Sequence, residues 1–373
     1  MNFTADDFRY MARALRLAER GVYTTRPNPR VGAVVLRDGE IVGEGFHAVA
    51  GGPHAEIPAL QMAGERARGA TVYVTLEPCC HFGRTGPCTH ALRAAGVARV
   101  VAAMEDPNPL MAGKGLAQLR DAGVDVACGL LEAEARLLNV GFVTRMTRQR
   151  PWVRCKIAMT LDGRTAAPSG ESQWITGEAA RHDVQAWRAR SGAIMTGVGT
   201  VLADDPSLTV RRADLGWDPA SAPGQPLRVI LDTRLRTPPQ ARLFTLPGET
   251  LIFTREQSGA RRNALSIVGA TVLVTEQGDL SERVDLVETL ACLAARQVNE
   301  VLVEAGPILS GALLAARLVD ELILYVAPSF LGDNGRGACH LPGLQQLAER
   351  RALHIVDMRA VGQDWRIIAK PEN

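Results

Sequence analysis

Four residues in the first third of the chain have the types and the order of a catalytic zinc site. His54 is followed two positions later by Glu56, and Cys79 and Cys88 each come directly after a proline. One imidazole and two thiolates suit Zn²⁺, and three protein ligands leave a fourth position for water, as in catalytic sites. The sequence therefore predicts zinc held by His54, Cys79 and Cys88, with Glu56 moving protons.

Other readings of these residues stay open at this point. Cys80 is a rival ligand, ranked second because the proline precedes Cys79 and adjacent side chains rarely turn toward one metal. The alternative without chemistry is a helix-capping histidine, a solvated glutamate and two buried cysteines, which would give the same sequence pattern. The joint pattern is more specific, and it resembles the signature of zinc nucleobase deaminases, with eight residues between Cys79 and Cys88 in place of two.

The elements around these residues alternate between helix and strand. Thr4 begins a predicted helix that runs to about residue 20, and Asp38-Gly39 is a hairpin turn signal between two apolar strands. That order predicts one sheet with helices on both faces, a three-layer α/β domain. The expected strands are 31–37, 40–46, 70–76, 98–104 and 124–129, and the further helices are about 54–65, 88–95, from about 113 and from 131.

A polar, basic stretch at 145–151 ends in proline and precedes a new apolar strand. We therefore place two domains at 1–146 and 151–373. Residues 212–226 are too rich in Pro, Gly and Asp for a helix or strand and are expected to be a surface loop. The second domain is also α/β, with strands at 152–159, 192–197, 227–232, 250–254, 270–275, 300–305 and 321–327 and helices near 177–190, 284–296 and 309–317.

The composition narrows the class of protein. Hydrophobic residues make up 46% and charged residues 22%, which is typical of a globular chain. A net charge of +2 provides no broad field toward nucleic acid or anionic membranes, so neither is an expected partner. No apolar run is long enough to span a bilayer, and seven cysteines, an odd number, favour a reducing compartment. We expect a cytoplasmic protein.

Longer motifs resemble the bifunctional riboflavin-pathway pyrimidine deaminase/reductase family over nearly the whole chain. Two positions depart from the family pattern, Gly86 where proline is common and Cys80 where serine is common, and neither is a predicted ligand. The motifs are RPNPRVGAVV (26–35), HAVAGGPHAE (47–56), TLEPCCHFGRTGPC (75–88), EDPNPLMAGKG (105–115), KIAMTLDGRTA (156–166), SGESQWIT (169–176), GVGTVLADDPSLTVR (197–211) and LVEAGPILSGALL (302–314).

The resemblance implies a cytidine-deaminase-like first domain with bound Zn²⁺ and a dihydrofolate-reductase-like second domain that uses NADPH. The first would hydrolyse the 2-amino group of 2,5-diamino-6-(5-phosphoribosylamino)pyrimidin-4-one, and the second would reduce the ribosyl group of the product to ribityl. Family contacts to base or phosphate in the first domain fall on Asn28, His47, His81 and Arg84.

Two glycine-rich turns in the second domain follow apolar strands and could admit a pyrophosphate, although neither completes a dinucleotide fingerprint. Of the ionisable residues, Lys156, Asp204 and Glu304 are placed on strand ends as candidates for the proton step, and a structural Lys–carboxylate pair is the alternative. Trp174 is alternatively a core residue. The resemblance places NADPH against Ala158, Trp174, Thr200, Asp204 and Gly306, and the substrate against Ser172, Arg188, Leu208, Arg211 and Glu304.

Other functions compete with this one. A nucleobase or nucleic-acid deaminase with an inactive or unrelated second domain would need a basic groove with exposed aromatic residues, which +2 and 5% aromatic residues support poorly. A non-catalytic zinc module would need a fourth protein ligand and no Glu56. A third alternative is that only the first domain is active. We also expect a homo-oligomer.

Overall fold

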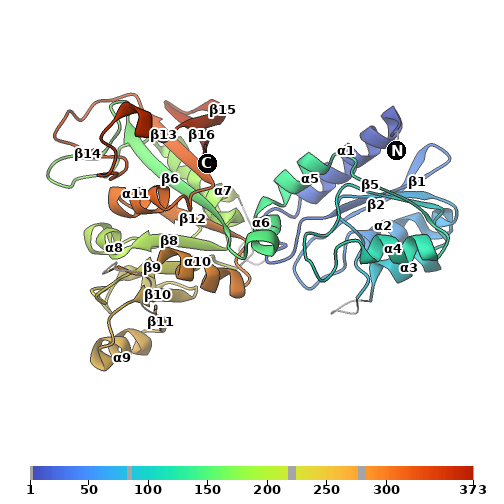
Figure 1. Ribbon diagram of the computed structural model, residues 1–373, viewed down its shortest axis with the longest axis horizontal. Helices are drawn as coiled ribbons and strands as arrows, with labels where there is room; N and C mark the ends of the chain where they lie inside the picture. The colour runs from blue at the N-terminus through green and yellow to red at the C-terminus, as the bar shows by residue number, and fades with distance from the viewer. Residues whose placement is uncertain (1–2, 82–85, 217–223, 276–282, 373) are drawn as a thin grey trace. The chain divides into compact units, whose positions relative to one another are not determined.

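The computed structural model describes residues 3–81, 86–216, 224–275 and 283–372, and the chain forms two compact units, Met1–Gln149 and Arg150–Asn373 (Figure 1). The predicted end of the first domain, residue 146, falls inside helix α6 (Val140–Arg148). The basic stretch is thus partly the last turn of a helix that buries Phe142 and Thr144. Among the described residues, we find no helix with the length and apolar character needed to cross a membrane.

A five-stranded sheet forms the centre of the first unit. Strands β3, β4 and β5 are parallel, and the predicted hairpin of β1 and β2 turns at Asp38 and Gly39, whose φ angles of 51° and 81° are those of a tight hairpin turn. In spatial order the strands are β2 (Glu40–Phe46), β1 (Gly32–Arg37), β3 (Thr71–Val74), β4 (Arg99–Ala102) and β5 (Asp125–Cys128).

Helices cover both faces of this sheet, as the alternation of elements predicted (Figure 1). On one face, α1 (Ala5–Glu19) and α5 (Glu132–Leu138) pack around Met11, Ala14 and Val34. The opposite face carries α2 (Glu56–Ala63), α3 (Cys88–Ala94) and α4 (Lys114–Asp121), with Leu92 and Leu116 in the core. The first unit is therefore a three-layer α/β domain.

Two glycines of β2 allow α2 to lie directly against the sheet. A Cβ at Gly43 would lie 2.1 Å from the carbonyl oxygen of Ala59, and one at Gly45 would lie 2.3 Å from that of Ala55. No side chain fits at such distances. The close approach at Ala55, the residue before α2, sets the position of the helix start that carries the candidate site.

The helix predicted from residue 131 is divided into α5 and α6 at Asn139. The Asn139 side chain pairs with the backbone of Arg30, accepting from its N–H at 2.7 Å and donating to its carbonyl at 2.9 Å. The residue takes φ −106° and ψ 23° between the two helices. A tertiary contact thus divides a segment that is continuous in its local pattern.

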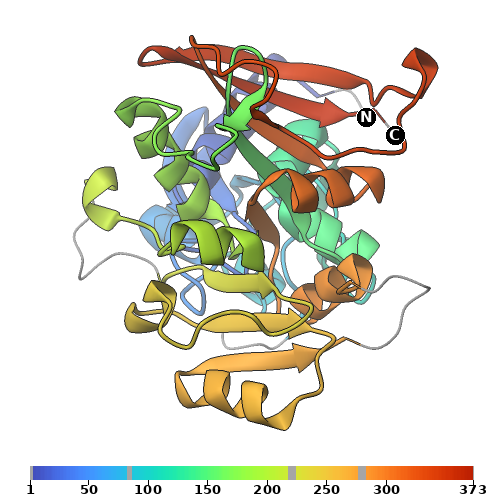
Figure 2. The same cartoon turned by 90° about the vertical axis from the view of Figure 1, so that its left-hand side faces the viewer.

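A nine-stranded sheet forms the second unit, with β15 and β16 at one end and β11 at the other (Figure 2). The strands from β11 to β13 in the spatial order run parallel, and β16 and β15 add an antiparallel hairpin. In spatial order they are β11 (Ala270–Val274), β10 (Thr250–Thr254), β9 (Leu227–Leu231), β8 (Ala193–Gly197), β12 (Glu300–Glu304), β6 (Trp152–Thr160), β13 (Glu321–Ala327), β16 (Asp364–Pro371) and β15 (Leu353–Val361).

The helices of this unit are α7 (Glu178–Arg190), α8 (Val198–Asp204), α9 (Gly259–Ile267), α10 (Leu286–Ala295) and α11 (Pro307–Ala315). Of these, α7, α10 and α11 match predicted helices, whereas α8, α9, β15 and β16 were not expected. A small additional sheet pairs β7 (Arg164–Ala166) with β14 (Arg336–Gly337). The expected loop at 212–226 begins with a short 3-10 helix, Arg212–Leu215, and residues 217–223 lie outside the described residues.

Candidate active sites

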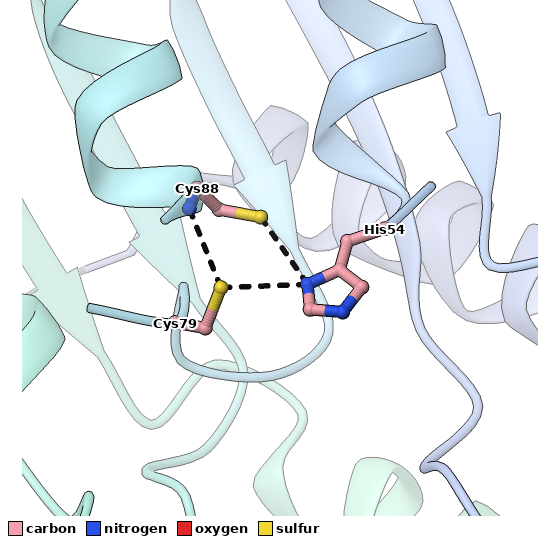
Figure 3. A group of neighbouring side chains, drawn as sticks. All are labelled: His54, Cys79 and Cys88. Carbon is pink, nitrogen blue, oxygen red and sulfur yellow. Dashed lines mark hydrogen bonds between the residues drawn. The ribbon is translucent and has the colours of Figure 1, made fainter. Parts of the chain in front are cut away.

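Three side chains from separate segments of the first unit meet at one point (Figure 3). His54 precedes α2, Cys79 lies in the loop after β3, and Cys88 is the first residue of α3. The Nδ1 atom of His54 lies 3.4 Å from the sulfur of Cys79 and 3.4 Å from that of Cys88. A tetrahedral zinc with ordinary bond lengths would separate such nitrogen and sulfur atoms by roughly 3.5 Å. The donor set and its spacing fit zinc.

The pKa values of the two thiols in this cluster are shifted in opposite directions. A hydrogen bond from the Cys88 thiol and the neighbouring His54 lower the pKa of Cys79, whose sulfur also accepts the backbone N–H of Cys88 at 3.3 Å. The same sulfur–sulfur hydrogen bond, together with burial, raises the pKa of Cys88. A divalent cation would favour the thiolate form of both.

Cys79 and not Cys80 belongs to this cluster. The group of donor atoms within 4.8 Å of one another consists, among the described residues, of those of His54, Cys79 and Cys88. The ranking of Cys79 above Cys80 agrees with this geometry.

Glu56 is buried at the start of α2, with 3% of its surface exposed. Its Oε2 atom is buried and has no hydrogen-bond partner among the described residues. Burial raises the pKa of this carboxyl to about 7. A carboxyl that is buried without a full set of partners is costly to stability and is typical of a functional site.

His47 and Asn28 form a short hydrogen-bonded chain next to His54. The Nδ1 atom of His47 lies 2.9 Å from the carbonyl oxygen of Pro53, and its Nε2 atom lies 3.1 Å from the amide nitrogen of Asn28. A carbonyl can only accept, so the His47 proton is on Nδ1, and Nε2 accepts from Asn28. Burial lowers the pKa of His47, which favours its neutral form. The rings of His47 and His54 meet edge to face, with centroids 5.5 Å apart.

Two other residues of this unit, His81 and Arg84, were predicted to contact base or phosphate. His81 is exposed, directly after the Cys79 loop. Arg84 lies outside the described residues.

In the second unit, Lys156, Arg188 and Glu304 lie together. Glu304 ends β12 and pairs in register with Lys156 on β6. The guanidinium of Arg188, on α7, donates to both carboxylate oxygens of Glu304 at 2.6 and 2.9 Å and to the carbonyl of Thr209 at 2.9 Å. Burial raises the pKa of Glu304, but the charge and hydrogen bonds of Arg188 outweigh it, so the net pKa is lowered. Burial lowers the pKa of Lys156.

Arg211 lies near this group, since its charge also favours the ionised form of Glu304. Its backbone N–H donates to the Gln185 side chain at 2.9 Å, and its Nε donates to Asp214 at 2.6 Å. Leu208, predicted to face the substrate, is 2% exposed and has a φ of 48°.

Asp204 does not lie on a strand end, contrary to our prediction. It is the last residue of helix α8 and is exposed, because the chain after β8 enters a helix at once. Thr200 lies in the same helix, and Gly306 is the N-cap of α11. The two helices follow β8 and β12, which are neighbouring parallel strands, so both begin at the same edge of the sheet. Lys156 also lies within β6, away from its end.

Trp174 is not a core residue. Its side chain is 68% exposed, and the guanidinium of Arg181 lies 4.7 Å from its ring. Ser172 lies in the same segment between β7 and α7, and Ala158 lies in β6 beside Tyr325 of β13.

Sequence comparison matches a known family to each of the two units. Residues 151–367 match the RibD C-terminal domain, and residues 4–104 match the cytidine and deoxycytidylate deaminase zinc-binding region. The riboflavin biosynthesis protein RibD of Escherichia coli K12 is 53% identical over 95% of this chain and 96% of its own length. The chain belongs to the RibD family.

Solved RibD structures agree with this assignment over the full length. RibD of Acinetobacter baumannii (form 1) is 45% identical, covers 98% of this chain and 99% of its own, and has a TM-score of 0.91. A Thermotoga maritima protein described as a diaminohydroxyphosphoribosylaminopyrimidine deaminase/5-amino-6-(5-phosphoribosylamino)uracil reductase is 33% identical over 98% of this chain and 99% of its own, with a TM-score of 0.83.

As a RibD protein, the chain is a bifunctional deaminase and reductase of riboflavin biosynthesis, with zinc and NADPH as cofactors. The predicted function and the α/β class are confirmed. Sequence reasoning missed Glu77, which is 6% exposed between Cys79 and the preceding strand. The available signal was a carboxylate between an apolar strand and a proline.

Proposed function

We propose that His54, Cys79 and Cys88 hold the zinc of the deaminase and that Glu56 carries protons. The observation that supports this most strongly is the convergence of one nitrogen and two sulfurs, each pair involving Nδ1 separated by 3.4 Å. Zinc in such a site activates water as a nucleophile at neutral pH.

Hydrolytic deamination adds water to the carbon that bears the amino group and releases ammonia. Glu56 takes a proton from the water and returns it to the departing amine, so the carboxyl ends in its starting state. Glu56 is the first residue of α2, and its Oε2 atom is buried and without a partner among the described residues. This position suits the exchange. The hydrogen-bonded chain of Asn28, His47 and Pro53 orients the loop that leads to His54.

We propose 2,5-diamino-6-(5-phosphoribosylamino)pyrimidin-4-one as the substrate of the first unit. The name of the Thermotoga relative supports this substrate class. The Asn28 amide and His47 imidazole supply donors and acceptors for a heterocycle, and His81 and Arg84 are assigned to its base or phosphate.

In the second unit, the charges of Lys156, Arg188 and Arg211 all favour the ionised form of Glu304, and Arg211 also pairs with Asp214, so three cations are set against two carboxylates. Such an excess of positive charge suits a ribose phosphate. We assign Arg211 to the phosphoribosyl group and Arg188 to holding Glu304, with Ser172 and Leu208 beside the substrate. We assign to Lys156 and Glu304 the supply or acceptance of the proton as the sugar ring opens.

NADPH supplies hydride to the sugar carbon when it is bound. We assign it to the edge where α8 and α11 begin, near Thr200 and Gly306, and also assign Ala158, Trp174 and Asp204, the last residue of α8, to its binding. The N-terminal N–H groups of α11, a nine-residue helix, suit a pyrophosphate.

The decisive experiment is incubation of the full-length protein with the diaminopyrimidine phosphoribosyl substrate, with and without NADPH, and identification of products by mass. Without NADPH we expect a product in which oxygen replaces one amino group. With NADPH we expect that product to gain two further hydrogens. Deamination without reduction would support a deaminase with an inactive second unit. If the protein does not deaminate this compound but does deaminate a simple nucleobase, the proposed substrate is wrong.

We also propose a homo-oligomer joined through β15. This strand ends the sheet order, and Ile355, Val356 and Met358 are 55%, 51% and 55% exposed on it. An open edge with exposed apolar side chains favours pairing with another strand. Ile355→Glu should shift the protein to a smaller species in light scattering, whereas Ile267→Glu, at a more exposed position on a helix, should not. Seven free cysteines fit a reducing, cytoplasmic setting.

A further inference from the structure

The carboxylate of Glu77 binds the backbone of a distant segment at four points. Its Oε1 atom accepts from the N–H groups of Gly115 at 2.7 Å and Leu116 at 3.3 Å. Its Oε2 atom accepts from those of Asp106 and Gly113, each at 2.9 Å. The loop after β4 and the first turn of α4 are therefore fastened to one side chain. None of these donors belongs to a side chain that substitution could remove.

The first turn of α4 is also pressed against the residue before Cys79. A Cβ at Gly115 would lie 2.0 Å from the carbonyl oxygen of Pro78 and 3.2 Å from Oε1 of Glu77. The backbone N–H of Glu77 donates to the carbonyl oxygen of Met104 at 2.9 Å, which holds the same turn to the segment just after β4. The peptide that leads into Cys79 is thus fixed from two sides.

A second contact joins α4 to the cysteine pair. The Thr89 hydroxyl, on α3, donates to the Gln118 side chain of α4 at 3.0 Å, and the Thr89 N–H donates to the carbonyl of Cys79 at 3.2 Å. The helix that Glu77 anchors therefore reaches both sides of Cys79. A shift of α4 would move Pro78 and Thr89 together.

We propose that Glu77 is a positioning residue for the deaminase, which sets the place of the Cys79 sulfur relative to His54 and Cys88 by anchoring α4. Its two carboxylate oxygens are taken up by four backbone N–H groups, and the donor cluster found among the described residues consists of His54, Cys79 and Cys88. Glutamine has nearly the same shape, but its amide nitrogen would face two N–H donors that need an acceptor. Glu77→Gln therefore loosens α4 and the Pro78–Cys79 turn without removing a ligand. The inference rests on the proposed role of Cys79.

The test compares Glu77→Gln with Glu105→Gln, the same change at an exposed site on the loop after β4, in full-length zinc-loaded protein. The rate of zinc transfer to a chromophoric chelator should rise about tenfold in Glu77→Gln, as for other groups that orient metal ligands. The cobalt-substituted protein should show altered ligand-field bands. Glu105→Gln should match the parent, and reduction of supplied deaminated product should be unchanged in both.

Zinc release and a cobalt spectrum equal to those of the parent would overturn the positioning role. If the parent itself held no zinc through Cys79, the proposed metal site would fail instead, which separates the two ideas. If Glu77→Gln does not fold, Gln118→Ala is the deciding variant. Gln118 is exposed, and its replacement removes the contact with Thr89 while the Glu77 carboxylate stays. Faster zinc release in that variant supports the role of α4, and an unchanged rate overturns it.

Discussion

Arg188 and Glu304 join α7 to the end of β12 through two parallel hydrogen bonds of 2.6 and 2.9 Å. Both side chains are largely buried, with 15% and 13% of their surfaces exposed. The third donor direction of Arg188 is used by the Thr209 carbonyl. The guanidinium is thus committed to the protein, and the exposed Arg211 is the better candidate for a ligand phosphate.

Removal of Arg188 should therefore act on stability first. Arg188→Ala leaves the carboxylate of Glu304 with Lys156 as its nearest cation, and losing one member of a buried pair costs about 3 kcal/mol. All five tryptophans lie at residue 152 or later, so tryptophan fluorescence during urea unfolding reports the second unit alone. A free energy of unfolding equal to that of the parent would show that the pair contributes nothing.

Removal of Arg211 should act on substrate use instead. Loss of a charged donor to phosphate costs about 1.5 to 3 kcal/mol, which corresponds to a roughly ten- to hundredfold higher KM in the reductase reaction. NADPH binding and deamination should be unaffected. Arg296→Ala, at an exposed site at the end of α10, is the control. Equal KM values for the two variants would withdraw Arg211 from the substrate site.

Exchange of single cysteines should separate the two neighbours. Cys79→Ser removes a sulfur that lies 3.4 Å from Nδ1 of His54 and should abolish stoichiometric zinc by metal analysis. Cys80→Ser should retain one zinc per chain, because Cys80 lies outside the donor cluster. The reverse order of zinc contents would make Cys80 the ligand.

Glu56→Gln should retain zinc and the fold but lose deamination by at least about a hundredfold, because an amide cannot carry a proton between water and amine at neutral pH. Reduction of supplied deaminated product should continue at the parent rate. The exposed Glu65→Gln serves as the matched control. Near-normal deamination by Glu56→Gln would remove this carboxyl from the mechanism.

Asp7 should make the first unit sensitive to acid. Burial opposes its ionisation, but hydrogen bonds from Thr4, Tyr73 and Arg99 outweigh burial and lower its pKa from 3.8 to about 2. Such a lowered pKa stabilises the fold by about 2 kcal/mol above pH 4, and this is lost as the pH falls toward 2. Asp7→Asn should lack that stability at pH 7 in urea unfolding followed by circular dichroism.

The gap in unfolding free energy between parent and Asp7→Asn should narrow between pH 4 and pH 2. The exposed Asp6→Asn should track the parent at every pH. A gap that stays constant down to pH 2 would contradict the assigned pKa.

The hairpin at Asp38-Gly39 and the buried parallel strands were predictable because their signals are local. A two-residue turn needs particular residues, and strands buried on both faces are continuous apolar runs. β15 lacked such a signal, since most of its residues are exposed and a bulge between Ile355 and Asp357 interrupts the alternation of faces. α8 was missed because a glycine-rich segment resembles a turn.

The sequence by itself predicted the chemistry of the candidate metal site, because the joint order of His54, Glu56, Cys79 and Cys88 is specific and each stands beside a predicted strand end or helix start. Only the tertiary structure decided that Cys79 faces His54, that Arg188 is occupied by Glu304, and that Glu77 holds α4. These relationships join residues far apart in the chain. Which side chains meet depends on how helices and strands pack, and local patterns carry no record of that.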